Sequence, residues 1–336
     1  MAFLTILVLT LSMFISRRKI KGTPYFYLED RVNAKRISVL LGAKQQALEK
    51  VSDGLESLLQ KKALEQAKRA QGQFHSRVLS FPEILTLERL RVDYALLKDY
   101  FPSGYVSFKE DEFVRYVQGS ASVEGNSLSL REALLVLTKG ASVAGKRVDE
   151  IREIENMKKA AEVSRKIKAI NERTIKKINT AILAGFSEKH PGQYRKGPMS
   201  ITASKVKPVS AGKVEGEVVK LLEWMDKNIN KIHPLELASE FHARFEHIHP
   251  FEDGNGRTGR EVLNWMLQKN AFPRAIINLG NRESYIALLE RIQLSREYEK
   301  FSKFIFLCLE KRAKEIHAIL GENKKAIVEE LVKSIK

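Results

Sequence analysis

The chain has 336 residues, and at about 150 residues per domain this length predicts two domains. Hydrophobic residues make up 43% and charged residues 29% of the sequence, with 19 Gly and 9 Pro. This composition is typical of a globular protein and excludes collagen-like, mucin-like and wholly disordered classes. The single cysteine, Cys308, excludes a disulfide framework within the chain and a cysteine-rich zinc module. It also indicates a reducing compartment, so we expect a cytoplasmic protein.

The sequence is strongly basic, with 58 Lys and Arg against 41 Asp and Glu and a formal net charge of +17. Such an excess favours anionic partners: nucleotides, acidic protein surfaces or nucleic acid. Because the basic residues are spread through amphipathic segments rather than gathered in one tract, a solvated surface is the simpler interpretation. Nucleic-acid binding stays open but is not favoured.

An apolar run from Ala2 to Ile15 opens the chain and is followed by Arg17, Arg18, Lys19 and Lys21. The run is too short to span a bilayer comfortably, and the order of charges is the reverse of that in a cleaved secretory signal. We interpret residues 1–22 as a separate apolar and basic segment. Our preferred hypothesis is an extension upstream of a true start at Met13, and the alternative is a short membrane-facing anchor.

Two runs of aromatic or β-branched residues follow, Tyr25–Leu28 and Ile37–Leu40. They predict a small N-terminal β-hairpin closed by Gly42. Most of the remaining chain repeats apolar residues at three- and four-residue spacing, which predicts a mainly α fold. The predicted helices cover residues 43–70, 84–100, 108–120, 149–183, 214–230, 234–247, 256–269, 284–293 and 298–319, with a helical tail from 323.

Two local patterns complete the predicted elements. Ser129 followed by Glu132 is a capping box that predicts the start of a further short helix. Residues 192–209 interrupt the helical pattern and are strand-like only over 199–202. They predict a two-stranded flap, with an ordinary surface hairpin as the alternative.

The most informative segment is His249–Arg260, with the sequence HPFEDGNGRTGR. Its glycines and asparagine let backbone N–H groups converge, and the helix expected to begin there adds its positive dipole end. This arrangement predicts a phosphate site. Arg257 and Arg260 lie three residues apart on the first turn of that helix, so both guanidinium groups can reach the same phosphate chain.

Two further residues of this segment suit a phosphate reaction. Asp253 is a hard oxygen ligand of the kind that binds Mg²⁺ next to phosphates. His249 is placed to take a proton from an attacking hydroxyl group near neutral pH.

The segment matches the signature HPFx(D/E/N)GNGRxxR of the Fic family at every defined position, so the chain resembles that family. The resemblance extends to Gly192–Arg195 and Asn281–Tyr285 and covers roughly Tyr116 to Glu310. It implies a helical bundle in which the motif loop opens a central helix, and transfer of AMP from ATP to a Ser, Thr or Tyr hydroxyl of a protein. We therefore divide the chain into residues 1–22, an N-terminal hairpin and helical region over 23–107, a Fic-type catalytic domain over 108–310, and a helical tail over 311–336.

The resemblance also implies roles for individual residues. His249 would be the general base, and Asp253 would hold Mg²⁺ or Mn²⁺. The phosphates of ATP would bind Gly254, Asn255, Gly256, Arg257 and Arg260. The adenine pocket would contain Tyr285, Leu289 and Gln293, Phe251 would be a core anchor, and Ile201 of the flap would clamp the target protein.

A second family pattern lies upstream: Ser120–Asn126, with the sequence SASVEGN, matches the inhibitory motif (S/T)xxxE(G/N). The resemblance implies that Glu124 pairs with Arg260 and thereby prevents productive ATP binding. The alternative is that Glu124 merely ends a helix beside Gly125. Some family members of this type also remove AMP, so deAMPylation or a bifunctional enzyme stays open.

Three other features of the sequence point to other classes of function. Gly140–Lys146 satisfies the P-loop pattern GxxxxGK, but Arg147 stands where Mg²⁺ binding needs Ser or Thr, so we interpret this segment as a loop between helices. His242, His247 and His249 could form a metallohydrolase site, although no HExxH motif is present. A basic regulator that binds nucleotide or nucleic acid without transfer is a third alternative. The expected partner is a protein with an exposed hydroxyl side chain, while self-modification and a homodimer stay open.

Overall fold

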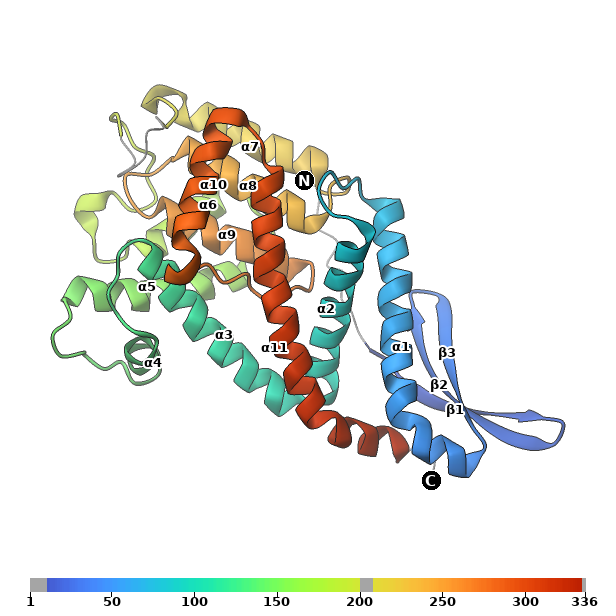
Figure 1. Ribbon diagram of the computed structural model, residues 1–336. Coiled ribbons are helices and arrows are strands. Elements are labelled where there is room, and N and C mark those ends of the chain that lie inside the picture. Colours follow the sequence, from blue (N-terminus) through green and yellow to red (C-terminus); the bar gives the residue numbers. More distant parts are fainter. Residues whose placement is uncertain (1–10, 200–207, 334–336) are drawn as a thin grey trace. The chain divides into compact units, whose positions relative to one another are not determined.

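The structure is a computed structural model that describes residues 11–199 and 208–333 (Figure 1). The described chain divides into two compact units. One comprises Glu110–Cys308, and the other comprises the described residues before Glu110 and after Cys308. The predicted mainly helical fold is confirmed, with a small antiparallel sheet near the N-terminus.

The sheet has three strands rather than the predicted two. They are β1 (Phe14–Ile20), β2 (Thr23–Val32) and β3 (Lys35–Gly42), in the order β1-β2-β3. The additional strand β1 lies within the segment predicted as residues 1–22. Its side chains are mostly exposed, so β1 is a polar edge strand without the apolar alternation by which strands are usually recognised.

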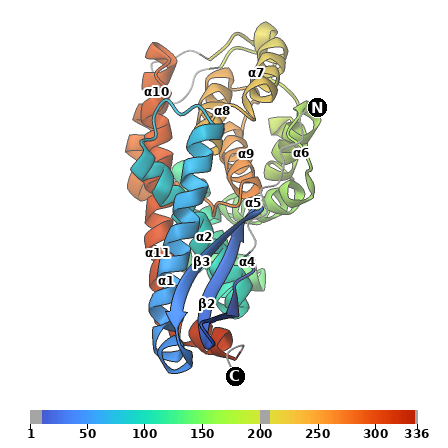
Figure 2. The ribbon, with the colours of Figure 1, turned by 90° about the vertical axis from the view of Figure 1, so that its right-hand side faces the viewer.

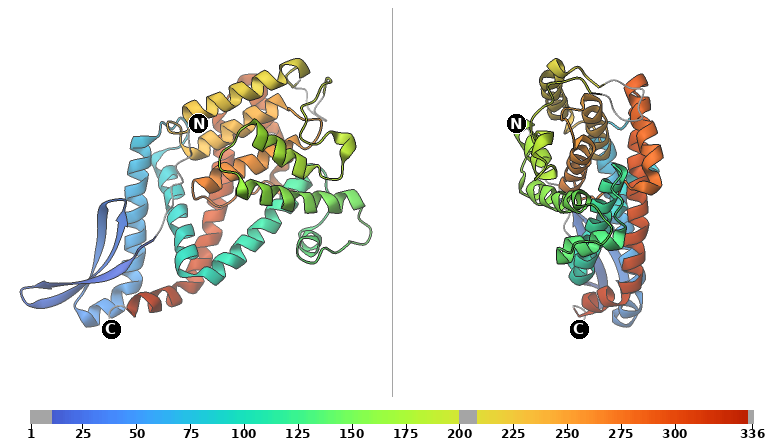
Figure 3. Two further views of the ribbon diagram at one scale, coloured as in Figure 1. Left: turned by 180° about the vertical axis from the view of Figure 1, so that it is seen from behind. Right: turned by 90° about the vertical axis from the view of Figure 1, so that its left-hand side faces the viewer.

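Two long helices pack with this sheet in the same unit. They are α1 (Lys44–Gln73) and α2 (Phe81–Tyr100), and α1 lies between the sheet and α2 (Figures 2 and 3). Beneath α1 the fully buried carboxylate of Asp30 on β2 pairs with the equally buried ammonium of Lys62, at 2.5 Å. The hydroxyl and N–H of Ser12 also donate hydrogen bonds to Asp30. The buried pair therefore links the sheet to α1.

The other unit contains the Fic-like motif. Its helices are the C-terminal part of α3 (Pro102–Val123), α4 (Leu130–Lys139), α5 (Val148–Lys166), α6 (Glu172–Ile182), α7 (Val214–Asn228), α8 (Pro234–Ile248), α9 (Asn255–Lys269), α10 (Arg282–Ser295) and the first turns of α11 (Glu299–Val332). The helix α9 is buried along nearly its whole length and packs against α5, α6 and α8. The motif loop therefore opens a central helix, as the family resemblance implies.

Most predicted helices are present with shifted ends, but two predictions were wrong in detail. The helix predicted over 149–183 is broken into α5 and α6 because Asn171 caps a new helix, with its Oδ1 accepting the Thr174 N–H at 3.0 Å. The helix predicted over 298–319 and the tail beyond it form one continuous helix, α11.

The capping box of α4 is confirmed, since Ser129 Oγ accepts the Glu132 N–H and Glu132 accepts the Ser129 N–H. The predicted flap falls largely on residues 200–207, so Ile201 lies outside the described residues. Over the two described ranges, no helix has the length and apolar composition needed to cross a bilayer.

The buried pair of Lys62 and Asp30 gives a stability prediction. Lys62→Met leaves the Asp30 carboxylate buried without its cation, and breaking such a pair costs about 3 to 5 kcal/mol of unfolding free energy. Urea unfolding followed by circular dichroism measures the loss. The control is Lys50→Met, because Lys50 is an exposed lysine of the same helix and should change stability by less than about 0.5 kcal/mol. Equal losses for both variants would contradict this account.

Candidate active site

The motif loop joins the end of α8 to the start of α9 in a fixed conformation. His249 caps α8 in the left-handed region, with φ 51°, and its N–H donates to the Phe245 carbonyl at 2.9 Å. The Asn255 side chain closes the loop by accepting the Phe251 N–H at 2.9 Å and donating to the Phe251 carbonyl at 2.8 Å. Phe251 is fully buried, as expected for a core anchor.

The start of α9 is shaped to receive an anion. Gly254 is the N-cap, with φ 75°, a conformation that glycine adopts without strain. The N–H groups of Asn255, Gly256 and Arg257 open the helix, where no carbonyl of the helix can accept them. The predicted phosphate-binding glycines and asparagine therefore lie at a helix N-terminus, which favours negative charge.

Arg195 anchors this loop, a role that the sequence did not predict. Its Nε donates to the His249 carbonyl at 2.7 Å, and its backbone N–H donates to the Pro250 carbonyl at 2.9 Å. Its guanidinium also donates to the carbonyls of Gly197 and Val209, which lie on either side of the segment outside the described residues. The only sequence signal was the place of Arg195 in the family-like run Gly192–Arg195.

Asn179 of α6 is a second anchor that the sequence did not reveal. Its Nδ2 donates to the Asp253 carbonyl at 3.0 Å, and its Oδ1 accepts the Gly192 N–H at 2.8 Å. A Cβ on Gly254 would lie 3.1 Å from Asn179 Nδ2 and 3.2 Å from Ile182. The close approach of α6 therefore also favours glycine at position 254.

His249 is largely withdrawn from water, with its side chain 16% exposed. Burial lowers the pKa of His249 to about 4, against the opposing effects of the Glu246 carbonyl, Glu124 and Asp253. The ring is therefore neutral at pH 7 and has a nitrogen free to accept a proton. Burial raises the pKa of Glu246, one turn earlier, to about 8, so that carboxyl group is mostly protonated at pH 7.

Asp253 presents its two carboxylate oxygens differently. Oδ1 accepts hydrogen bonds from the Gly254 N–H at 2.5 Å and from a guanidinium nitrogen of Arg257 at 3.1 Å. Oδ2 instead pairs with the Lys189 ammonium at 2.6 Å. Burial tends to raise the pKa of Asp253, but Arg257 and Lys189 outweigh it and hold the pKa below its usual value. An ionised, partly exposed carboxylate directly before the start of α9 fits the preference of Mg²⁺ for oxygen ligands.

The described residues contain no group of three or more His, Cys, Asp and Glu side chains arranged to hold a metal ion. A magnesium ion at Asp253 would therefore take its other ligands from phosphates and water, as is usual for this ion. His242, His247 and His249 do not form the metal site considered from the sequence. The His242 ring is buried and hydrogen-bonded to the Tyr285 hydroxyl at 2.9 Å, while His247 lines a separate cavity.

The two arginines of the motif are both buried and both paired. Arg257 contacts Glu153 of α5 and Asp253, each at 3.1 Å. Arg260 is 1% exposed. Its guanidinium donates to Ser120 Oγ at 3.0 Å, the Ser120 carbonyl at 2.9 Å, the Tyr285 hydroxyl at 3.2 Å and Glu124 Oε1 at 2.7 Å.

The carboxylate of Glu124 lies directly over the start of α9. A Cβ on Gly256 would be 2.2 Å from Glu124 Oε1. Burial tends to raise the pKa of Glu124, but Arg260 and Arg257 lower it, so the carboxylate is ionised. Arg282 holds the end of α3 in place through a hydrogen bond from Nε to the Val123 carbonyl at 2.8 Å. An anionic group of the protein itself thus occupies the anion-favouring position.

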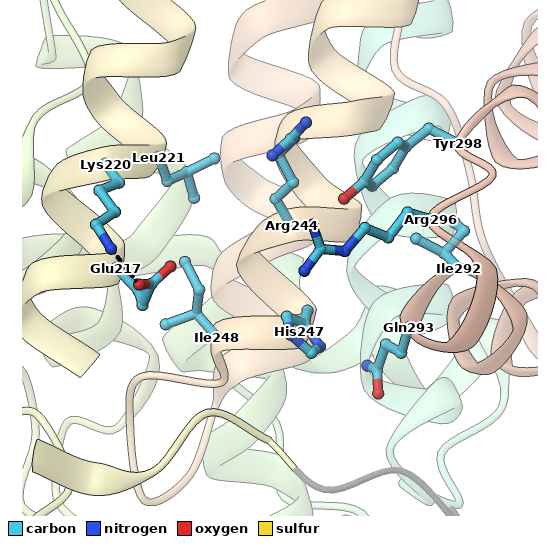
Figure 4. A pocket seen from close by; sticks show the side chains of 10 residues that line it. All are labelled: Glu217, Lys220, Leu221, Arg244, His247, Ile248, Ile292, Gln293, Arg296 and Tyr298. Carbon is cyan, nitrogen blue, oxygen red and sulfur yellow. Dashed lines mark hydrogen bonds and ion pairs between the residues drawn. The ribbon is translucent and has the colours of Figure 1, made fainter. Parts of the chain in front are cut away.

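The three residues predicted for the adenine pocket lie at four-residue spacing on α10. Gln293 of α10 lines one side of a cavity of about 280 Å³ (Figure 4). Lys220 and Leu221 of α7 line the opposite side. Tyr285 instead is buried, with its hydroxyl on Arg260 and His242. Leu289 does not line this cavity.

The P-loop alternative has no support in the structure. Gly140 ends α4 and Lys146 lies in the loop before α5, so the segment follows a helix and not a strand. The Lys146 ammonium donates to the Ser127 carbonyl at 2.7 Å. This agrees with a loop between helices.

Comparison with known proteins agrees with this geometry. Residues 169–267 match the model of the Fic/DOC family. The chain is 27% identical over 209 residues to Protein adenylyltransferase Fic of Drosophila erecta, covering 60% of this chain and 41% of the relative. The same protein of Aedes aegypti gives 27% identity with 60% and 41% coverage. The chain thus spans less than half the length of these relatives.

Solved structures share the fold. A Fic domain containing signaling protein from Bacteroides thetaiotaomicron superposes with a TM-score of 0.63 at 21% identity, covering 72% of this chain and 96% of that one. A Fic family protein from Desulfovibrio desulfuricans gives a TM-score of 0.62 at 24% identity, with 74% and 78% coverage. Residues 169–267 are therefore similar to the Fic/DOC family, and the chain is distantly similar to protein adenylyltransferases Fic over part of its length.

Proposed function

We propose that the chain transfers AMP from ATP to a Ser, Thr or Tyr hydroxyl group of a protein, or of itself. The observation that carries the proposal is the motif loop. It holds a buried, neutral imidazole, a carboxylate suited to Mg²⁺ and the free N-terminal N–H groups of α9 within one short segment. A base, a cation ligand and a phosphate site are the three parts that attack of a hydroxyl on a phosphate requires.

In the proposed reaction His249 accepts the proton of the target hydroxyl as the hydroxyl oxygen attacks the α-phosphorus of ATP. A bond forms between that oxygen and the α-phosphorus, the bond from the α-phosphorus to the bridging oxygen breaks, and pyrophosphate leaves. The N–H groups at the start of α9 orient the phosphates, together with Arg257 and Arg260. Mg²⁺ at Asp253 would neutralise negative charge on the phosphates.

The cavity beside the motif loop supports a place for the nucleoside. It includes Ile248, the residue directly before His249, and Gln293, whose side-chain amide can both donate and accept hydrogen bonds. We propose that Gln293 faces the base there, and that Tyr285 acts instead by holding Arg260.

We further propose that the resting protein is autoinhibited by Glu124. A γ-phosphate oriented by Arg260 would have to replace the Glu124 carboxylate, which already contacts that guanidinium at 2.7 Å. The same carboxylate also lies over Gly256, so it would repel the phosphates electrostatically. ATP therefore binds productively only when Glu124 moves away.

Removal of the Glu124 side chain tests both proposals. We expect Glu124→Gly to raise AMP transfer from ATP with Mg²⁺ or Mn²⁺ by at least about tenfold, the effect of about 1.4 kcal/mol. Intact-mass analysis of the protein and of a cell lysate measures the AMP adducts. Glu124→Gln, which removes the charge but keeps the shape, should give an intermediate gain.

The controls separate the two proposals. Adding His249→Ala to Glu124→Gly should abolish the adduct, because the base is lost. Equal transfer by the wild type and Glu124→Gly would contradict autoinhibition alone. A lack of adduct in every variant, with both metals, would contradict AMP transfer.

The low pKa of His249 predicts an unusual pH dependence. Because the ring is protonated only near pH 4, kcat/KM of Glu124→Gly should stay level from about pH 8 down to about pH 6 and fall only below that. The Glu124 carboxylate favours the protonated ring of His249. Its loss in this variant therefore moves the fall in kcat/KM to a lower pH. Circular dichroism at each pH excludes unfolding, and a midpoint near pH 6.5 would contradict a buried base.

A further inference from the structure

Lys189 occupies the side of Asp253 that a metal ion would need. Its ammonium lies 2.6 Å from Asp253 Oδ2, whereas Oδ1 is engaged within the loop by Gly254 and Arg257. Both side chains are about one-third exposed. The ammonium therefore contacts the carboxylate oxygen that the loop itself leaves available.

The position of this ammonium is supported by its surroundings. Lys189 ends the short helix Ser187–Lys189, and its Nζ lies 4.8 Å from the centre of the Phe186 ring. The next residue, His190, contacts Glu252 Oε2 through Nδ1 at 2.6 Å. Two consecutive residues thus contact two consecutive residues of the motif loop, which fixes the register between the segments.

We propose that Lys189 is a positioning residue that competes with the divalent cation for Asp253, an inference that rests on the proposed function. An ammonium and Mg²⁺ that both contacted Asp253 Oδ2 would repel each other at close range, so each weakens binding of the other. Without the divalent cation, Lys189 pairs with Asp253 Oδ2. The cation binds by displacing Lys189.

The competition has a measurable consequence for metal affinity. A partly exposed ion pair is a modest competitor, strengthened here by the cation–π contact with Phe186. Its removal should therefore tighten binding of the divalent cation by roughly three- to tenfold. If Lys189 instead oriented Asp253 for the metal, its removal would weaken binding.

The test uses Mn²⁺ as the probe, followed by electron paramagnetic resonance, on the full chain carrying Glu124→Gly. The nucleotide is α,β-methylene-ATP, which cannot transfer AMP, so the readout is independent of catalysis. Lys189→Met should bind Mn²⁺ about three- to tenfold more tightly than the parent. Lys189→Arg, which keeps the charge, should stay within about twofold of the parent.

Two controls identify the site and the cause. Asp253→Ala should remove the Mn²⁺ binding that responds to Lys189. Lys176→Met removes a nearby positive charge that pairs with Glu172 and not with Asp253, so it should leave the affinity within about twofold of the parent. Loop structure is checked by circular dichroism of each variant.

The outcomes distinguish this inference from the proposed function. Unchanged or weaker Mn²⁺ binding in Lys189→Met, or an equal gain in Lys176→Met, would overturn the competition while leaving AMP transfer intact. Loss of AMP transfer in every variant of the intact-mass experiment would overturn the proposed function, whatever the affinity for Mn²⁺. The absence of Mn²⁺ binding at Asp253 in all variants would overturn the competition as well.

Discussion

The buried charge of Arg260 is the constraint on which the arrangement of the site depends. A guanidinium that is 1% exposed must have its donors satisfied within the protein, because an unpaired buried charge is strongly destabilising. Its partners come from α3, from Glu124 directly after α3, and from α10, so one side chain of α9 ties together helices that are distant in sequence. The same group is proposed to receive the γ-phosphate, and substrate therefore has to replace part of what holds the fold together.

Local sequence predicted the motif loop well because its determinants are local. The N-terminal position of Gly254–Gly256 on α9 and the buried Phe251 follow from residues within one turn of each other. The contact between Glu124 and Arg260 is long-range, and it was predictable only because both residues belong to recognisable family patterns. Lys189, Asn179 and Arg195 act on the loop from another part of the chain. Only Arg195 lies in a family-like run, and no local pattern distinguishes Lys189 and Asn179 from ordinary polar residues.

The fold was predictable where side-chain periodicity and burial agree. The amphipathic helices and the capping box at Ser129 are of this kind. The strand β1 was missed because it is an edge strand whose exposed basic residues resemble a flanking charge cluster. The break between α5 and α6 was missed because Asn171, the cap of α6, lies between two stretches that each have helical apolar spacing. The contact of Tyr285 with Arg260 was not predicted, because it joins residues 25 positions apart in the sequence.

The short connection after α3 reaches both arginines of the motif. Glu124 pairs with Arg260, while Asn126 donates to Glu153, which in turn pairs with Arg257. A ligand that loosens this connection would therefore affect both guanidinium groups together. Suppose that a protein or surface draws residues 124–126 away from α9 and thereby strengthens nucleotide binding. Thermodynamic reciprocity then requires that nucleotide strengthens binding of that protein or surface by the same factor. The end of α3 would thus act as a point through which contacts elsewhere on the chain adjust the response to ATP.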